Sequence, residues 1–332
     1  MATATNHAEQ IQKTPFVKEL ASSERKTRDK ALESLSLFLR ARRDLSLLEL
    51  LKIWKGLFFC FYHSDRPLTQ QALARDLSYT LVPSLPRESR LRFLRAFWIT
   101  IGREFHALDR LRLDKYLLLI RYYVGVAFEV YLQGQIGQSD NTGDVGRDGK
   151  KRKRAGEEKS KNGKRRKQDS ATAEAKTEEN NIKGEKWAEL ESYITLLEQG
   201  PLCPINFDPT EEDESKEKKS EEDSIPMPHG PDGLRYHIND IWLDELAKVI
   251  DTNSGEDEGE GQKSLKDRFD IPMDLLLRPF KKLKNECPTK SVRLRVSREV
   301  LEDARLVEWG FREKVVEEDS DVEEDEWDGL GD

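Results

Sequence analysis

The chain has 332 residues, of which 36% are hydrophobic and 36% are charged, and its formal net charge is −8. This composition predicts one ordered domain with long solvated segments rather than two full domains. No apolar run is long enough to span a bilayer, and three widely separated cysteines indicate a reducing compartment and argue against a zinc module.

Charge is distributed unevenly along the chain. Residues 1–137 carry 22 Lys and Arg against 14 Asp and Glu, and residues 147–167 carry 12 against 3. Residues 168–332 carry 22 basic and 45 acidic residues. A basic first half and an acidic second half favour a body that faces nucleic acid and a solvating tail, although the charge could also serve solubility alone.

The first 137 residues are patterned as helices. Thr14 followed by Pro15 is typical of a helix start. Apolar residues at helical spacing predict a longer helix over residues 24–43. Asp44 is the predicted cap of the next helix, which is apolar around most of its circumference and is therefore expected to be buried.

Three further helices complete this half. One is expected from Pro67 to about Leu81, because two prolines follow it, and the next over residues 87–106. Asp109 is the predicted start of the last helix. Six helices in three consecutive pairs predict an all-α fold, either an irregular α-solenoid or a helical-repeat-like bundle.

The remaining residues alternate between polar runs and short amphipathic helices. The latter are too short to fold alone, so we expect them to dock on the helical body. The predicted helices are 186–199, 240–250 and 297–309, the last capped by Ser297. The predicted organisation is a disordered N-terminus (1–13), the helical body (14–137), a disordered basic loop (138–185), docking helices with acidic disordered insertions (186–310) and an acidic tail (311–332).

Two strings mix aromatic residues with fixed charges on these helices. The first is IWKGLFF at residues 53–59, followed by SDRPL at 64–68. The second is RAFWIT at 95–100, followed by REF at 103–105 and DRLRLDK at 109–115. In this order and spacing they resemble the eukaryotic nucleolar family whose founding member is ribosomal RNA processing protein one.

The resemblance covers about residues 14–135, and Phe105 stands where the family pattern has tryptophan. It continues weakly through GLRYHI at 233–238, IWLDEL at 241–246 and LRPF at 277–280. It implies a nuclear and nucleolar, non-enzymatic factor of large-subunit assembly. Its implied partners are precursor ribosomal RNA and other assembly factors, with no cofactor, membrane or small-molecule substrate.

Two other functions remain open from the residues. One is a catalytic RNA-processing enzyme, although no catalytic constellation and no metal-ligand spacing is evident. The other is a nuclear chaperone for basic proteins that uses the acidic half.

A two-part basic run is the most specific signal apart from the resemblance. Such clusters in a flexible loop are typical of nuclear localisation signals that importin binds, or of a nonspecific RNA-binding loop. The residues are Lys150, Lys151, Arg152, Lys153, Arg154, Lys164, Arg165, Arg166 and Lys167. In the acidic tail, Ser320 is a possible phosphorylation site.

Candidate phosphate contacts lie on two of the predicted helices. Arg92, Arg95 and Arg103 share one narrow arc at 100° per residue, and Arg112 and Lys115 share a face of the next helix. A merely solvated face is the competing interpretation.

For the helix that carries Arg112 and Lys115, ion pairing within the helix is a structural alternative to phosphate contact. Asp109 with Arg112 and Arg110 with Asp114 have the spacing of ion pairs on a helix surface. The aromatic residues are expected to be structural core rather than base-stacking platforms: Trp54, Phe58, Phe97 and Trp98.

Overall fold

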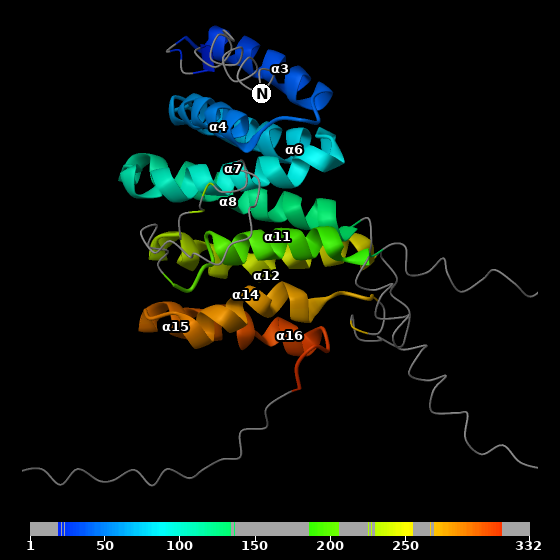
Figure 1. The fold of residues 1–332 in the computed structure, drawn as a ribbon. Coiled ribbons are helices and arrows are strands. Elements are labelled where there is room, and N and C mark those ends of the chain that lie inside the picture. Colours follow the sequence, from blue (N-terminus) through cyan, green and yellow to red (C-terminus); the bar gives the residue numbers. More distant parts are fainter. Residues whose placement is uncertain are drawn as a thin grey trace, which may run out of the picture.

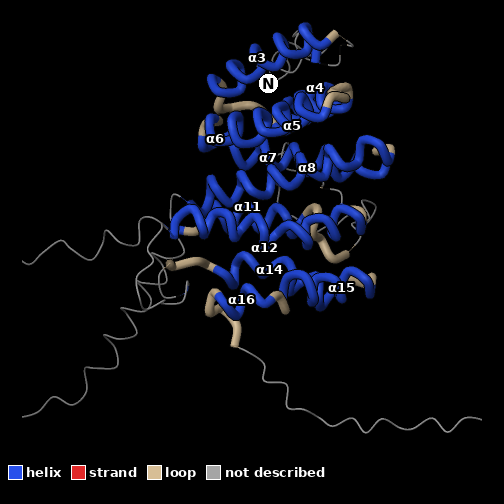
Figure 2. Tube along the Cα trace, turned by 180° about the vertical axis from the view of Figure 1, so that it is seen from behind, coloured by secondary structure: helices blue, strands red, loops and turns tan. Residues whose placement is uncertain are grey.

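The fold is a stack of helices. The computed structural model describes residues 24–133, 186–205, 230–254 and 269–313, with a few isolated positions beside them. Figure 1 shows the helices lying across the stack in successive layers, from α3 at one end to α15 and α16 at the other, and the view from behind agrees (Figure 2). The regular elements within these ranges are all helical, which confirms the predicted all-α, helical-repeat-like class.

The helices have the following bounds. In the first half they are α3 (Arg25–Ala41), α4 (Leu47–Tyr62), α5 (Pro67–Arg75), α6 (Leu81–Ser84), α7 (Arg87–Glu104) and α8 (Arg110–Phe128). In the second half they are α11 (Ala188–Gln199), α12 (Asp232–Ser254), α14 (Met273–Glu286), α15 (Lys290–Val296) and α16 (Ala304–Glu308). Within the described ranges, no helix is both long and apolar enough to cross a membrane.

Local capping chemistry sets two of the helix starts. Ser46, rather than the predicted Asp44, caps α4: its side chain accepts a hydrogen bond from the Glu49 backbone N–H (3.2 Å), and the Glu49 carboxylate accepts one from the Ser46 N–H (2.9 Å). This reciprocal box requires a glutamate three residues after the cap, and Asp44 lies two residues too early. Asp109 caps α8 as predicted, accepting from the N–H groups of Leu111 and Arg112.

Helix α5 begins at Pro67, as predicted, but the helical segment continues past the predicted end at Leu81. A π-helical turn over Asp76–Thr80 joins α5 to α6, so Pro83 lies inside a helix and the chain becomes extended only at Leu85. The π-turn already interrupts the α-helical hydrogen-bond ladder, which places Pro83 directly after a break.

The second half departs further from the prediction. Helix α12 begins at Asp232, eight residues before the predicted start at residue 240, and neither α14 nor α15 was predicted. Pro279 lies inside α14. Ser297 caps nothing, because α15 runs directly into a π-helical turn over Ser297–Leu301.

The predicted end of the last helix is correct. Asp303 caps the short helix α16 by accepting from the Arg305 N–H at 2.8 Å. Gly310 ends this segment with a φ of 82°, a conformation that favours glycine.

An aromatic cluster fills the space between α4, α7 and α8. Trp54 contacts Phe93 and Phe97 at ring-centroid distances of 5.1 and 5.0 Å, and Phe97 stacks on Tyr123 at 3.8 Å. The four residues predicted to be core are all buried: Trp54, Phe58, Phe97 and Trp98. The core continues into the second half, where Trp242 of α12 contacts Phe128 of α8 and Phe280 of α14.

Candidate nucleic-acid interface

The predicted arginine arc of α7 is only partly exposed. Arg103 is exposed, but Arg92 and Arg95 are half-buried. Arg92 donates a hydrogen bond to the Leu45 carbonyl at 2.8 Å, and Arg95 donates one to the Ile225 carbonyl at 3.2 Å. The expected exposure of the whole arc is therefore wrong, because Leu45 and Ile225, which lie outside α7 and far from it in the sequence, contact two of its three members.

Arg92 and Arg95 face a small cleft between α7 and α11. Its volume is about 250 Å³. Helix α11 contributes hydroxyl and amide side chains that the sequence pattern did not single out. The lining residues are Glu88, Leu91, Arg92, Arg95, Ser192, Thr195, Leu196 and Gln199.

The chemistry of this cleft suits an anion. Guanidinium groups bind phosphate oxygens through charge-assisted hydrogen bonds, and hydroxyl and amide groups add neutral donors. Two arginines outweigh one glutamate, Glu88, which also lies 4.0 Å from Arg43. Ser192 is exposed, and its hydroxyl donates to the Ala188 carbonyl at 2.8 Å, so its side chain lies at the mouth of the cleft.

Lys115 and Arg112 lie elsewhere, at the start of α8. Lys115 is only 5% exposed, and its ammonium donates to the carbonyls of Tyr62 (2.8 Å) and Ser64 (2.9 Å). Burial lowers the pKa of Lys115. The prediction that Lys115 contacts phosphate is therefore wrong, because the carbonyls at the end of α4 already bind its ammonium.

Arg112 takes part in the structural network that was the competing interpretation. Its guanidinium pairs with Asp109 at 2.6 Å and lies over the Tyr62 ring at 4.3 Å. Hydrogen bonding to Asp109 raises the pKa of Arg112 and, reciprocally, lowers the pKa of Asp109. Arg110 and Asp114 are both exposed, and no ion pair joins them in the described structure.

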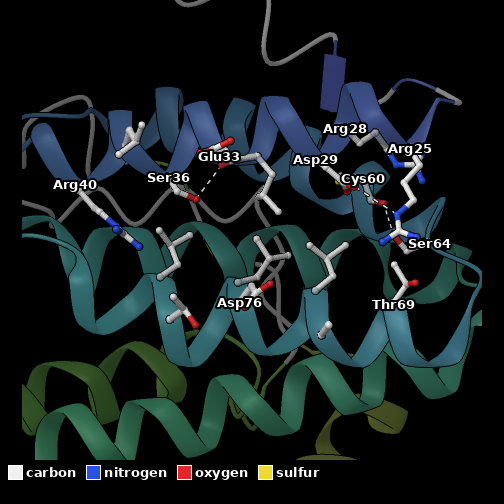
Figure 3. Close-up of a pocket in the computed structure, with 17 residues that line it drawn as sticks. Arg25, Arg28, Asp29, Glu33, Ser36, Arg40, Cys60, Ser64, Thr69 and Asp76 are labelled. Carbon is white, nitrogen blue, oxygen red and sulfur yellow. Dashed lines mark hydrogen bonds and ion pairs between the residues drawn. The ribbon is translucent and has the colours of Figure 1, made fainter.

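A larger groove of about 530 Å³ separates α3 from α5 and α6 (Figure 3). Leucines line it together with charged residues of both signs, including Arg25, Asp29 and Asp76. Cys60 also lines it, but burial raises the pKa of this thiol to about 11. The thiol is therefore protonated at neutral pH and is a poor nucleophile.

Comparison with known proteins decides the family. The profile of the family described as "Nucleolar protein, Nop52" matches residues 11–142 and 221–329, which is more than half of the chain. The chain belongs to the Nop52 family. The family description confirms the predicted nucleolar assignment.

Relatives of this Nop52-family chain share one name. Ribosomal RNA processing protein 1 homolog B from Homo sapiens is 30% identical over 239 residues, which is 70% of this chain and 22% of that protein. The Mus musculus homolog B is 42% identical over 120 residues, which is 35% of this chain and 17% of that protein. The Dictyostelium discoideum homolog is 29% identical over 115 residues, with coverages of 35% and 23%. The chain thus spans about a fifth of the length of these relatives.

The residues that match the Nop52 family include only one of the two helices that form the α7–α11 cleft. Helix α7 lies within the matched residues, whereas α11 lies between the two matched segments. The basic run Lys150–Lys167 and Ser320 lie outside the described residues. Within the described part, no three His, Cys, Asp or Glu side chains are grouped so that they could hold a metal ion.

Proposed function

We propose that this Nop52-family chain supports ribosomal RNA processing as a non-catalytic scaffold in the precursor of the large ribosomal subunit. The family membership and the shared name of its relatives support the role in processing. The stacked helices of Figure 1, with one hydrophobic core through all layers, suit a scaffold that holds its surfaces at fixed distances. The partners under this proposal are precursor ribosomal RNA and other assembly factors.

The cleft between α7 and α11 is the proposed RNA contact. Arg92 and Arg95 each donate a hydrogen bond to a backbone carbonyl outside α7, so their guanidinium groups are oriented before RNA binds. Preorientation reduces the entropic cost of binding. Arg103, exposed near the other end of α7, is a second candidate contact.

A glutamate at the mouth of the cleft tests this contact without removing a structural arginine. Ser192→Glu places a negative charge beside Arg92 and Arg95. The matched control is Ser34→Glu on α3, because Ser34 is also exposed and its hydroxyl likewise bonds the carbonyl four residues earlier. Binding of labelled precursor RNA would be measured by fluorescence anisotropy over a series of KCl concentrations.

We expect Ser192→Glu, but not Ser34→Glu, to weaken binding and to reduce the log–log salt slope by about 0.7 for each phosphate that the chain no longer binds. Arg103→Gln tests the second candidate in the same way. Equal binding by Ser192→Glu and the wild type would show that RNA is bound elsewhere. Cleavage of the RNA after addition of Mg²⁺ would favour the enzyme, and competition by polycations rather than polyanions would favour the chaperone.

We also infer that importin carries the chain into the nucleus through residues Lys150–Arg154 and Lys164–Lys167. The density of basic residues in this segment supports the proposal. Replacing these residues by glutamine should move a fluorescently tagged chain into the cytoplasm. Unchanged nuclear accumulation would contradict it.

A further inference from the structure

A smaller pocket lies between α8 and α12, away from the proposed RNA contact. Its volume is about 190 Å³. The lining residues come from the π-turn after α5, from α8 and the π-turn that follows it, and from α12. They are Tyr79, Gly125, Glu129, Gln133, Glu245, Lys248, Val249 and Thr252.

Glu245 is the central residue of this pocket. Its side chain is only 1% exposed, and its Oε1 atom accepts hydrogen bonds from Arg121 (2.5 Å) and Lys248 (2.6 Å). Its Oε2 atom is buried and has no hydrogen-bond partner among the described residues. Because a buried carboxylate oxygen is strongly favoured to accept hydrogen bonds, Oε2 is an acceptor without a donor.

Gly125 lets this oxygen and the Tyr79 hydroxyl pack closely against α8. A Cβ atom at position 125 would lie 2.6 Å from Glu245 Oε2 and 2.3 Å from the Tyr79 hydroxyl oxygen. The carboxylate and the phenol therefore converge above the same glycine. Burial, together with the negative charges of Glu245 and Glu129, raises the pKa of Tyr79, so the phenol stays neutral.

The charges around the pocket are not balanced. Asp244 and Asp303 continue the network through Arg305, which bonds both of them, and Arg121 also bonds Asp244. Glu129 is exposed at the rim and forms no ion pair within the described structure. The bonded network holds the three carboxylates Asp244, Glu245 and Asp303 against the three cations Arg121, Lys248 and Arg305, so the Glu129 carboxylate is an additional, uncompensated negative charge. One positive charge would neutralise it.

We propose that this pocket binds the side-chain cation of an arginine or lysine on a protein partner. Guanidinium and ammonium groups carry several donors and no acceptor, which matches Glu245 Oε2, the Glu129 carboxylate and the Tyr79 oxygen. The volume exceeds the roughly 30 Å³ that one water occupies. The surface is distinct from the α7–α11 cleft, so this proposal and the RNA contact can fail independently.

Ethylguanidinium chloride, an analogue of the arginine side chain, is the probe. It would be titrated into the full chain, and the methyl signals of Val249 and Thr252 would be followed by NMR. Ethylurea is the neutral control of similar shape. We expect saturable shifts with ethylguanidinium and none with ethylurea.

Two variants test the assignment. Gly125→Ala introduces a Cβ atom that must displace Glu245 Oε2 and the Tyr79 hydroxyl from their positions, and Glu129→Gln removes the rim charge without touching the buried network. Each should weaken ethylguanidinium binding by about tenfold, the scale of one charge-assisted hydrogen bond. Glu33→Gln, an exposed glutamate on α3, is the matched control and should bind like the wild type. A melting curve first establishes that Gly125→Ala is folded, whereas Glu129→Gln perturbs only an exposed side chain.

Equal shifts with ethylguanidinium and ethylurea, or unchanged binding by Glu129→Gln, would overturn the proposal. A photo-crosslinking amino acid at Thr252, which is exposed at the rim, extends the test to cells. Mass spectrometry should find peptides of a protein partner with an arginine or lysine at the crosslink. Crosslinks to RNA alone would also overturn the proposal.

Discussion

Around α4, α7 and α8 the layers meet through aromatic rings, whereas from α11 to α16 ion pairs between helices are added to the apolar core that runs through all layers. Trp54 alone contacts three other rings in the first region, those of Phe93, Phe97 and Tyr123. In the second region, Arg121 and Arg305 converge on Asp244 from α8 and α16, each at 2.9 Å.

The second region has another such junction between α11 and α14. Arg278 bonds Glu198 at 2.7 Å and Glu191 at 3.2 Å, and Lys282 bonds the other oxygen of Glu198 at 2.7 Å. Glu198 and Glu245 are both buried. Apolar contacts are non-directional, whereas these bonds require fixed geometry. We infer that aromatic packing supplies most of the stability of the first region and that ion pairs set how the later helices align.

The largest expected effect is in the aromatic region. Trp54→Ala should lower the free energy of unfolding by about 3–5 kcal/mol, because it empties a fully buried aromatic site and removes the bond from the indole N–H to the Phe93 carbonyl. Urea unfolding followed by circular dichroism measures this. Leu111→Ala, at a side chain that is 92% exposed, is the control and should change stability by less than about 0.5 kcal/mol. A decrease of less than about 1 kcal/mol for Trp54→Ala would contradict the comparison, because it falls well below the range for a buried aromatic residue.

The next effect is in the ionic region. Arg121→Met should cost about 2–3 kcal/mol, less than the value for a fully buried pair, because Arg121 is 32% exposed and Lys248 still bonds Glu245. The double variant Arg121→Met with Glu245→Leu should recover part of this stability, since no uncompensated carboxylate remains buried. If the double variant is instead less stable than Arg121→Met alone, the loss of packing at Glu245 outweighs the removal of its buried charge. Packing rather than charge would then stabilise this contact between α8 and α12.

The contact between α8 of the first region and α12 of the second should make the stability of the fold depend on pH. His237 of α12 bonds the Leu117 carbonyl of α8 at 2.8 Å, and burial lowers its pKa below the ordinary value of 6.5, with Asp240 and Arg121 acting in opposite directions. Below pH 6.5 the unfolded chain therefore binds a proton that the folded chain does not. The stability from neutral His237 is complete above that pH and decreases as the pH falls towards the folded-state pKa.

Unfolding measured between about pH 7.5 and 5, a range that brackets the ordinary histidine pKa, should show this decrease in the wild type and a flatter curve in His237→Gln. His106→Gln, at an exposed histidine, is the control and should keep the wild-type slope. Identical slopes for all three chains would mean that His237 does not contribute.

The same division explains how far the sequence predicts this fold. In the first region a single apolar pattern determines burial, so the core aromatics and the helix starts at Asp109 and Pro67 follow from local rules. In the second region α14 was missed because Pro279 lies within it, and proline ordinarily interrupts a helix. Charged residues there join helices that are distant in sequence, which no local pattern reveals.

The candidate site shows the same limit. Helical periodicity placed Arg92 and Arg95 on one face correctly, but it could not show that α11 would face them with Ser192 and Thr195. Lys115 looked like a surface cation because its three-residue spacing from Arg112 is typical of a solvated face. Its burial depends on two carbonyls that lie far earlier in the chain, those of Tyr62 and Ser64.

The smallest expected effect comes from an exposed pair in the same ionic region. Arg295 of α15 bonds both oxygens of Asp240 on α12, at 2.8 and 2.7 Å, so its geometry is as good as that of Arg121. The two side chains are 44% and 37% exposed, however, and water competes with exposed pairs. Arg295→Gln should therefore cost less than about 1 kcal/mol, and most of that cost should disappear in about 0.5 M KCl because salt screens exposed charges. The cost of Arg121→Met should persist in the same salt, because Glu245 stays buried. If salt reduces the cost of both variants equally, burial does not determine how much an ion pair contributes to stability. The alignment of the later helices would then depend on the total charge of the region rather than on its buried ion pairs.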